Sequence, residues 1–197
     1  MKIISWNLNH RTLEKPISSD VCRFLIDSGA DLICLNEYVD GPSRRGFEDT
    51  LNQAGFAYRF LSHRLGNNNQ IFIASKLPAC VGDITAPDLT DAATTNFLHI
   101  KLVESSIEIV GLRAPAYKFA FERNAYWAQL GAIIRAASSR KIIFVGDFNY
   151  DPFLGATRGA AAIDFNLGGH FSIQNPEGDW SFMSIDGQKT SRIDHVL

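Results

Sequence analysis

The sequence predicts an α+β fold in which helices cover the faces of a largely mixed β-sheet core. Short apolar, β-branched runs alternate along the chain with a few segments of helical periodicity, which is typical of packed sheet and helix layers. Two strand-like segments, 97–103 and 107–112, are joined by so short a loop that they must pair as antiparallel neighbours. No linker, repeat or low-complexity tract interrupts the chain, so we expect a single domain over residues 1–197.

Helical spacing and glycine stops set the boundaries of the expected helices. Ile17, Val21 and Phe24 recur on one helical face, and Gly29 follows them as a C-terminal stop. A second helical pattern is closed in the same way by Gly55. The expected strands cover residues 3–6, 32–35, 58–61, 70–74, 97–103, 107–112 and 141–145, and the expected helices cover about 16–28, 44–54 and 121–137.

The composition is that of a globular protein in a reducing compartment. A chain of 197 residues with 46% hydrophobic and 20% charged residues can bury a large core without disulfides. The cysteines Cys22, Cys34 and Cys80 are odd in number and form no CxxC pair, so we interpret them as core thiols. The N-terminal apolar run turns polar at Asn7, too early for a signal peptide, and no stretch approaches about 18 apolar residues. We therefore expect a cytoplasmic protein without a membrane span.

The net charge gives no general attraction to nucleic acid. The formal charge is −2 and the pI is near 6.2, whereas nucleic-acid binding usually rests on clustered lysine and arginine. A polyanionic substrate must therefore meet a local patch. Arg11, Arg44 and Arg45 are candidates because they follow two segments that carry candidate site residues, and a solvated charged surface is the alternative interpretation.

Polar side chains stand at the ends of several expected strands. Each one alone fits a turn or a helix cap, which is the usual place of asparagine and aspartate. Four such strand ends in one chain instead favour a shared site, because carboxylate and carboxamide oxygens at one sheet edge suit a hard divalent cation such as Mg²⁺. The residues are Asn7 and Asn9 after the first strand, Glu37 after the second, Asp147 and Asn149 after the strand that ends near residue 145, and Asp194 in the C-terminal segment.

Four short motifs in this order resemble those of the endonuclease/exonuclease/phosphatase superfamily. They are Trp6-Asn7-Leu8-Asn9, Leu35-Asn36-Glu37, Gly146-Asp147-Phe148-Asn149 and Ser191-Arg192-Ile193-Asp194-His195. The Gly-Asp-Phe-Asn element after an apolar strand is the most specific of them. The resemblance covers nearly the whole chain and implies a DNase I-like fold, a four-layer α/β/β/α sandwich with two mixed β-sheets.

The resemblance also implies a role for each matching residue. Glu37 is the principal ligand of Mg²⁺, with Mn²⁺ as a second ion, and Asn7 supports both the metal and the substrate phosphate. Asn9 lies near the metal and the phosphate. Asp147 positions or deprotonates the attacking water, and Asn149 donates a hydrogen bond to the phosphate. The chain is expected to be a metal-dependent phosphoric ester hydrolase.

Two positions depart from the pattern of the superfamily. Arg113 stands at the strand end where members often carry a tyrosine or histidine, and a guanidinium there can clamp phosphate; an exposed strand-end arginine is the alternative. His10 stands where relatives of exonuclease III carry glycine. Together the two changes argue against a standard abasic-site endonuclease.

The C-terminal motif is also incomplete. Asp194 resembles the aspartate that orients a catalytic histidine, but the chain ends at Leu197 before the Ser-Asp-His strand that supplies this histidine. His195 adjoins Asp194 on an expected strand, where successive side chains point to opposite faces, so we do not expect it to substitute. We expect the chain ending at Leu197 to hydrolyse little or no substrate, and an exposed sheet edge to favour self-association.

Three functions remain open at this point. A nuclease acting on phosphodiester bonds of nucleic acid is the first hypothesis. A phosphatase acting on a small phosphomonoester or a lipid headgroup is the second, and a catalytically silent phosphate-binding or interaction module is the third. The substrate cannot be read from these motifs because one fold carries many activities in its loops.

Overall fold

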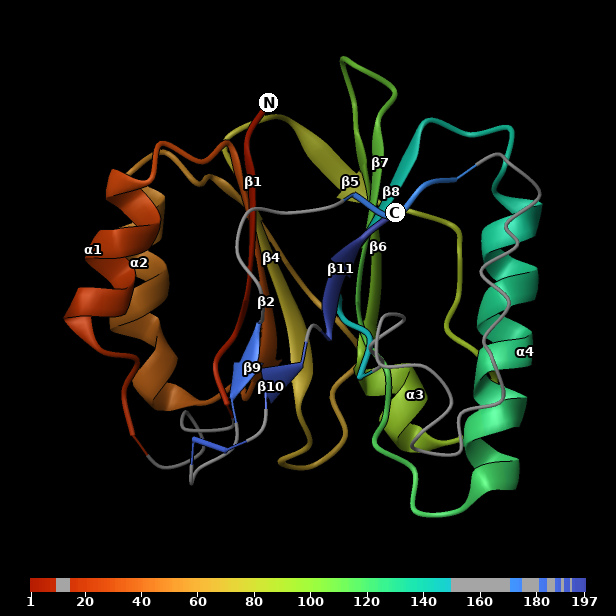
Figure 1. Ribbon diagram of the computed structural model, residues 1–197. Helices are drawn as coiled ribbons and strands as arrows, with labels where there is room; N and C mark the ends of the chain where they lie inside the picture. The colour runs from red at the N-terminus through yellow and green to blue at the C-terminus, as the bar shows by residue number, and fades with distance from the viewer. Residues whose placement is uncertain (10–14, 150–170, 175–180, 184–186, 189, 192) are drawn as a thin grey trace.

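The computed structural model describes residues 1–9, 15–149, 171–174, 181–183, 187–188, 190–191 and 193–197. In these regions two β-sheets pack against each other and helices cover the outer faces, which gives four layers (Figure 1). Each sheet contains both parallel and antiparallel pairs. The expected α/β/β/α sandwich with two mixed sheets is confirmed.

The first sheet has the strand order β1-β2-β4-β3. β1 and β2 run parallel, whereas β4 pairs antiparallel with both β2 and β3. Helices α1 and α2 cover its outer face (Figure 1). The bounds are β1 Ile3–Asn7, α1 Ser19–Asp27, β2 Leu32–Tyr38, the 3-10 turn η1 Pro42–Arg44, α2 Arg45–Gln53, β3 Tyr58–Leu61 and β4 Gln70–Ser75.

The second sheet has the strand order β11-β8-β7-β6-β5. β7 and β8 run parallel, and the other pairs are antiparallel. The long helix α4 covers the face opposite the first sheet (Figure 1). The bounds are β5 Ala79–Val81, α3 Asp91–Thr95, β6 Phe97–Leu102, β7 Glu108–Arg113, α4 Ala120–Ala136, β8 Ile142–Asp147 and β11 Asp194–Val196, with a separate pair formed by β9 Phe182–Met183 and β10 Thr190–Ser191.

The sheets approach each other closely at their centre. Cys34 and Ile73 of the first sheet pack with Ile109 and Val145 of the second in one buried cluster. Gly111 of β7 permits this approach, because a Cβ atom there would lie 2.7 Å from the Cys34 sulfur. The two sheets therefore pack in direct contact, which places their strand ends close to each other.

Several sequence-based boundaries need correction. β2 continues through Tyr38, so Glu37 lies inside the strand and not after it. α1 begins at Ser19 and not near residue 16, because the Ser18 side chain caps the helix by accepting from the Asp20 N–H. Cys80 lies exposed on β5 and is not a core thiol.

Two further expectations concern the surroundings of the protein. No helix within the described ranges has the length and apolar character needed to cross a membrane. The cytoplasmic location stays a prediction. Within the same ranges β1 is the outer strand of its sheet, with β2 as its neighbour. Self-association along a sheet edge also stays a prediction.

Candidate active site

The carboxyl ends of two parallel strand pairs meet at one end of the sandwich (Figure 1). In the second sheet Arg113 of β7 lies beside Asp147 of β8, and Asp194 of the antiparallel β11 lies on the other side of Asp147. In the first sheet Asn7 ends β1, next to β2 and its Glu37. Both sheets therefore deliver polar side chains to the same edge.

Four of these side chains are in direct contact. The Asn7 amide donates to a carboxylate oxygen of Asp147 at 2.9 Å and to one of Glu37 at 3.3 Å. Arg113 Nε donates to the same Glu37 oxygen at 2.9 Å and lies 3.6 Å from Asp147 Oδ2. Asp147 is 1% exposed and Glu37 is 8% exposed, so both carboxylates are largely shielded from solvent.

The backbone of the site is strained at three positions. Among the described residues other than glycine, φ is positive at Asn9 (54°), Glu37 (55°), Asn149 (48°) and Ser106 (56°). Asparagine tolerates this left-handed conformation, but glutamate seldom adopts it. At Glu37 the pairing of β2 with β4 is irregular between Leu35 and Tyr38, so the strand bulges there. Strained backbone of this kind is concentrated at functional sites.

Hydrogen bonds hold the Asp147 carboxylate in place. The Asn149 N–H donates to Asp147 Oδ1 at 2.8 Å, and the Asn149 amide donates to the Ala114 carbonyl at 2.6 Å. Asn9 contributes through its backbone, because its N–H donates to Asn7 Oδ1 at 2.7 Å and so orients the Asn7 amide toward the two carboxylates.

Asn36 is a supporting residue that the sequence-based interpretation missed. It is fully buried, and in the orientation that satisfies its neighbours its amide donates to the Leu112 carbonyl and accepts from the Asp147 N–H, both at 3.2 Å. It thus joins β2 of the first sheet to β7 and β8 of the second. The available signal was an amide residue inside an otherwise apolar run.

Several acidic side chains gather at this edge. We call Asn7, Glu37, Arg113, Asp147, Asn149 and Asp194 the strand-end site. Burial raises the pKa of Asp147, although the Asn149 N–H and the Arg113 charge act in the opposite direction. Burial, followed by the negative charge of Asp147, raises the pKa of Asp194 to about 7. Among the described residues the carboxyl groups of Glu37, Asp147 and Asp194 gather at this edge, and Arg113 contacts the first two. Carboxylate oxygens of this kind suit a divalent cation.

The remaining sequence candidates lie elsewhere. Arg44 is 1% exposed and donates to the carbonyls of Val39 and Lys15, so it is a structural residue and not part of a substrate patch. Arg45 is exposed at the start of α2. Arg11 and His10 lie outside the described residues.

His195 faces the core of the second sheet. It is 3% exposed, and its ring lies 5.7 Å from that of Phe148, which belongs to the cluster packed against α4. Its neighbour Asp194 is paired with Asp147 where β11 runs antiparallel to β8. The alternation of side chains along a strand accounts for this separation.

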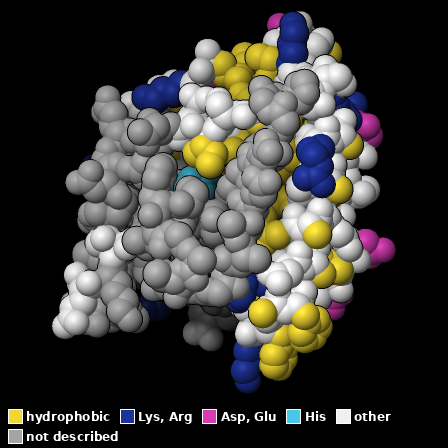
Figure 2. Space-filling model, turned by 45° about the vertical axis from the view of Figure 1, so that its right-hand side comes forward, with side chains coloured by type: hydrophobic (Ala, Val, Ile, Leu, Met, Phe, Trp, Pro, Cys, Tyr) yellow, Lys and Arg dark blue, Asp and Glu magenta, His cyan; other side chains and the backbone are white. Residues whose placement is uncertain are grey.

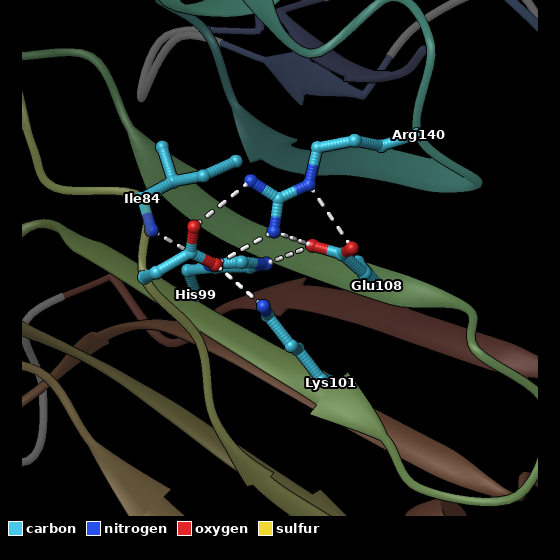
Figure 3. A network of polar contacts seen from close by, with 6 residues as sticks. Ile84, His99, Lys101, Glu108 and Arg140 are labelled. Carbon is cyan, nitrogen blue, oxygen red and sulfur yellow. Dashed lines mark hydrogen bonds and ion pairs between the residues drawn. The ribbon is translucent and has the colours of Figure 1, made fainter.

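A second cluster of charged groups is formed by residues of β6 and β7, with Asp83 from the loop after β5 and Arg140 from the loop before β8. We call its members Asp83, His99, Lys101, Glu108 and Arg140 the Arg140 network (Figure 3). Asp83, His99 and Glu108 offer ligand atoms within 4.8 Å of one another. However, Arg140 donates to both carboxylates, at 2.7 Å and 3.2 Å to Asp83 and at 3.0 Å to Glu108 Oε1. Lys101 lies 2.6 Å from Asp83.

The histidine of the Arg140 network has both ring nitrogens engaged. The Ile84 N–H donates to His99 Nδ1 at 3.0 Å, so the proton of the neutral ring lies on Nε2, which is 2.7 Å from Glu108 Oε2 (Figure 3). Burial lowers the pKa of His99 and keeps the ring neutral. Two cations balance two carboxylates here, and the histidine has no lone pair left for a metal.

The solved structures with the same fold include several enzymes that act on phosphoesters. A 3'-5' exonuclease (NExo) from Neisseria meningitidis is 19% identical with a TM-score of 0.70, over 100% of this chain and 86% of that one. NExo from Neisseria is also described as a 3' phosphatase bound to product DNA hairpin. An AP endonuclease from Archaeoglobus fulgidus is 14% identical with a TM-score of 0.71, over 100% and 85% of the two chains.

One further solved structure and two sequence comparisons bear on the family of this chain. Truncated TDP2 from Caenorhabditis elegans is 13% identical with a TM-score of 0.67, over 98% of this chain and 82% of that one. A search of curated proteins found no match. The model of the Endonuclease/Exonuclease/phosphatase family matches residues 4–197, nearly the entire chain, and the protein is accordingly a member of that family.

Proposed function

We propose that the protein is a metal-dependent phosphoesterase that hydrolyses phosphodiester bonds, with Mg²⁺ or Mn²⁺ held by Glu37 and Asn7. The observation that carries this proposal is the convergence of Glu37, Asp147 and Asn7 in direct hydrogen-bond contact at the strand-end site, with the Asp194 carboxyl beside Asp147. Family membership supports hydrolysis of phosphoesters as the reaction class.

The residues of the strand-end site have separate proposed roles in phosphoester hydrolysis. A divalent ion, when bound, offsets the charge that develops on the phosphate oxygens. Arg113 places a guanidinium at the same edge, where it would hold a phosphate oxygen. Asp147 would position or deprotonate the attacking water, and Asn149 would donate a hydrogen bond to the phosphate through its amide. Asn9 sets the orientation of Asn7 through its backbone.

Nucleic acid is the substrate class that we favour. The structures with this fold include a 3'-5' exonuclease and an AP endonuclease. A phosphatase acting on a phosphomonoester is the second candidate, and the description of NExo as a 3' phosphatase favours it. The two reactions use the same phosphate site and differ in the group that leaves.

A panel assay tests the proposal. Single- and double-stranded DNA, RNA, nucleotides and phospholipids are incubated with Mg²⁺, with Mn²⁺ or with EDTA, under single-turnover conditions that resolve slow hydrolysis. We expect slow, metal-dependent cleavage of a nucleic-acid phosphodiester, and its loss in Glu37→Gln. The matched control is Glu108→Gln, which removes the same charge from the Arg140 network. Cleavage unaffected by EDTA, or equally reduced in both variants, would refute the proposal.

A further inference from the structure

Two neighbouring phenylalanine side chains are exposed to solvent at the start of α4. Phe119 is 52% exposed and Phe121 is 71% exposed, which is the largest value among the exposed large hydrophobic residues that the structure describes. Their ring centroids are 5.8 Å apart and their planes differ by 20°, so they form a stacked pair. Exposed apolar surface of this kind marks an interaction site more often than chance.

Helix geometry fixes the outward direction of this pair. α4 buries Tyr126, Leu130 and Ile134, which recur every four residues. Phe121 lies five residues before Tyr126, and at about 100° per residue this places it about 140° from the buried face. Repacking of the helix against the sheet therefore cannot bury Phe121 without exposing the core residues.

The segment that carries the pair is anchored. The Tyr117 hydroxyl lies 2.8 Å from Thr90 Oγ1, and its ring packs 5.8 Å from that of the buried Tyr126. The Arg123 N–H donates to the Phe119 carbonyl at 3.2 Å, which closes the first turn of the helix. A partner would meet the two rings already in place, without the entropy loss of ordering a loop.

The pair lies at the end of the molecule that carries the strand-end site. Phe119 is six positions after Arg113 in the chain, a span of at most about 21 Å. The start of α4 lies at the same end as the carboxyl ends of β1 and β7 (Figure 1). Lys118 Nζ lies 5.7 Å from the centre of the Phe119 ring. Figure 2 shows hydrophobic side chains gathered beside a positively charged one at the lower end of the face in view.

We propose that Phe119, Phe121 and Lys118 form a stacking platform for unpaired bases of a nucleic-acid strand whose phosphate is bound at the strand-end site. The inference rests on the proposed function, because it names a strand with unpaired bases as the substrate class. Flat aromatic faces accept any base by stacking, and a neighbouring ammonium attracts the backbone phosphate. The exposed rings, the adjacent cation and the nearby phosphate site fit this ligand together.

The test compares strands with and without bases. Fluorescence anisotropy measures the affinity of the protein for a labelled oligothymidylate, for a strand of equal length with abasic sugars, and for a duplex, all with Ca²⁺ in place of Mg²⁺ so that a divalent ion can be bound while hydrolysis stays slow. F119A/F121A should weaken oligothymidylate binding about tenfold or more and leave the abasic strand within about twofold. Lys118→Ala should weaken both strands and lower the salt dependence by about 0.7 in log–log slope. Phe24→Ala, another exposed phenylalanine but on α1, is the control and should change neither strand.

Several outcomes would overturn the platform. These are unchanged oligothymidylate binding by F119A/F121A, an equal loss for both strands, or no strand binding by the wild type. A wild-type dimer in light scattering that the double variant dissociates would identify a protein interface, and loss of sedimentation with anionic vesicles would identify a membrane contact. Binding to duplex alone would overturn the platform and leave the proposed phosphoesterase standing. Thermal unfolding confirms that each variant is folded.

Discussion

The strand-end site and the Arg140 network are both clusters of carboxylates around an arginine, yet their charges are arranged in opposite ways. In the network, Arg140 and Lys101 neutralise two carboxylates, and both nitrogens of His99 are occupied. In the strand-end site Arg113 contacts the carboxylates of Glu37 and Asp147, and burial and like charge raise the pKa of Asp194 beside Asp147. Proximity of ligand atoms alone therefore does not identify a metal site, because the cations already paired with those atoms must be considered as well.

The largest difference between the two clusters should appear in catalysis. Asp147→Asn should reduce metal-dependent hydrolysis by about 10² to 10⁴, because the group proposed to position or deprotonate water is lost. Asp83→Asn removes a carboxylate from the Arg140 network and should leave the rate within about twofold. Single-turnover rates of both variants provide the comparison. Equal rates for the two variants would remove the distinction between the clusters.

The second difference should appear in metal affinity. Glu37→Gln should weaken Mn²⁺ binding by about tenfold or more, since a charged ligand becomes neutral, and a higher metal concentration should restore part of the activity. Glu108→Gln should bind Mn²⁺ like the wild type. Calorimetric titration of each protein measures the affinity. A weaker affinity in Glu108→Gln alone would transfer the metal site to the Arg140 network.

The third difference concerns stability. Arg140→Gln should lower the free energy of unfolding by about 1 to 3 kcal/mol, because Glu108 would lose its cation while half-buried. Arg113→Gln should also destabilise the metal-free protein, but Mg²⁺ should restore its stability by binding the folded state. Mg²⁺ should not rescue Arg140→Gln. Urea unfolding with and without Mg²⁺ tests both variants, and Arg135→Gln, an exposed arginine of α4, is the control.

The smallest difference should appear in the pH dependence of stability. The pKa of Asp194 is raised from 3.8 to about 7, so the folded metal-free protein holds an extra proton between these values, and this contribution is lost as the pH rises through about 7. The pKa of His99 is lowered from 6.5, so the unfolded chain takes the proton first and stability is lost as the pH falls below 6.5. Asp194→Asn should remove the first slope and His99→Gln the second, in urea unfolding at a series of pH values. Unchanged slopes would contradict the assigned charges.

The fold could be predicted because its signals are local. Apolar runs and helical spacing recur within a few residues, and they predicted the longer strands and the long helix without knowledge of distant contacts, whereas the short elements β5 and α3 were missed. The extension of β2 through Tyr38 was missed, because Asn36 and Glu37 are polar and interrupt the apolar run. Their place inside the strand depends on the bulge opposite β4.

The site could be predicted only in part. Asn7, Glu37 and Asp147 lie within recognisable motifs, and the structure brings them into contact. Their catalytic roles stay predictions. The roles of Asn36 and Arg44 depend on hydrogen bonds to residues on other elements, which no local pattern encodes. The sequence does not distinguish a buried arginine from a surface arginine, because burial is determined by the fold.

The position of a bound metal tests the central claim most directly. Crystals soaked in Mn²⁺ reveal the ion through its anomalous scattering. The carboxylate cluster of the strand-end site predicts a peak at the Glu37 carboxylate, with Asn7 beside it, and the cations paired within the Arg140 network predict none between Asp83 and Glu108. A peak found only in the Arg140 network, or only at places remote from Glu37, would contradict the assignment.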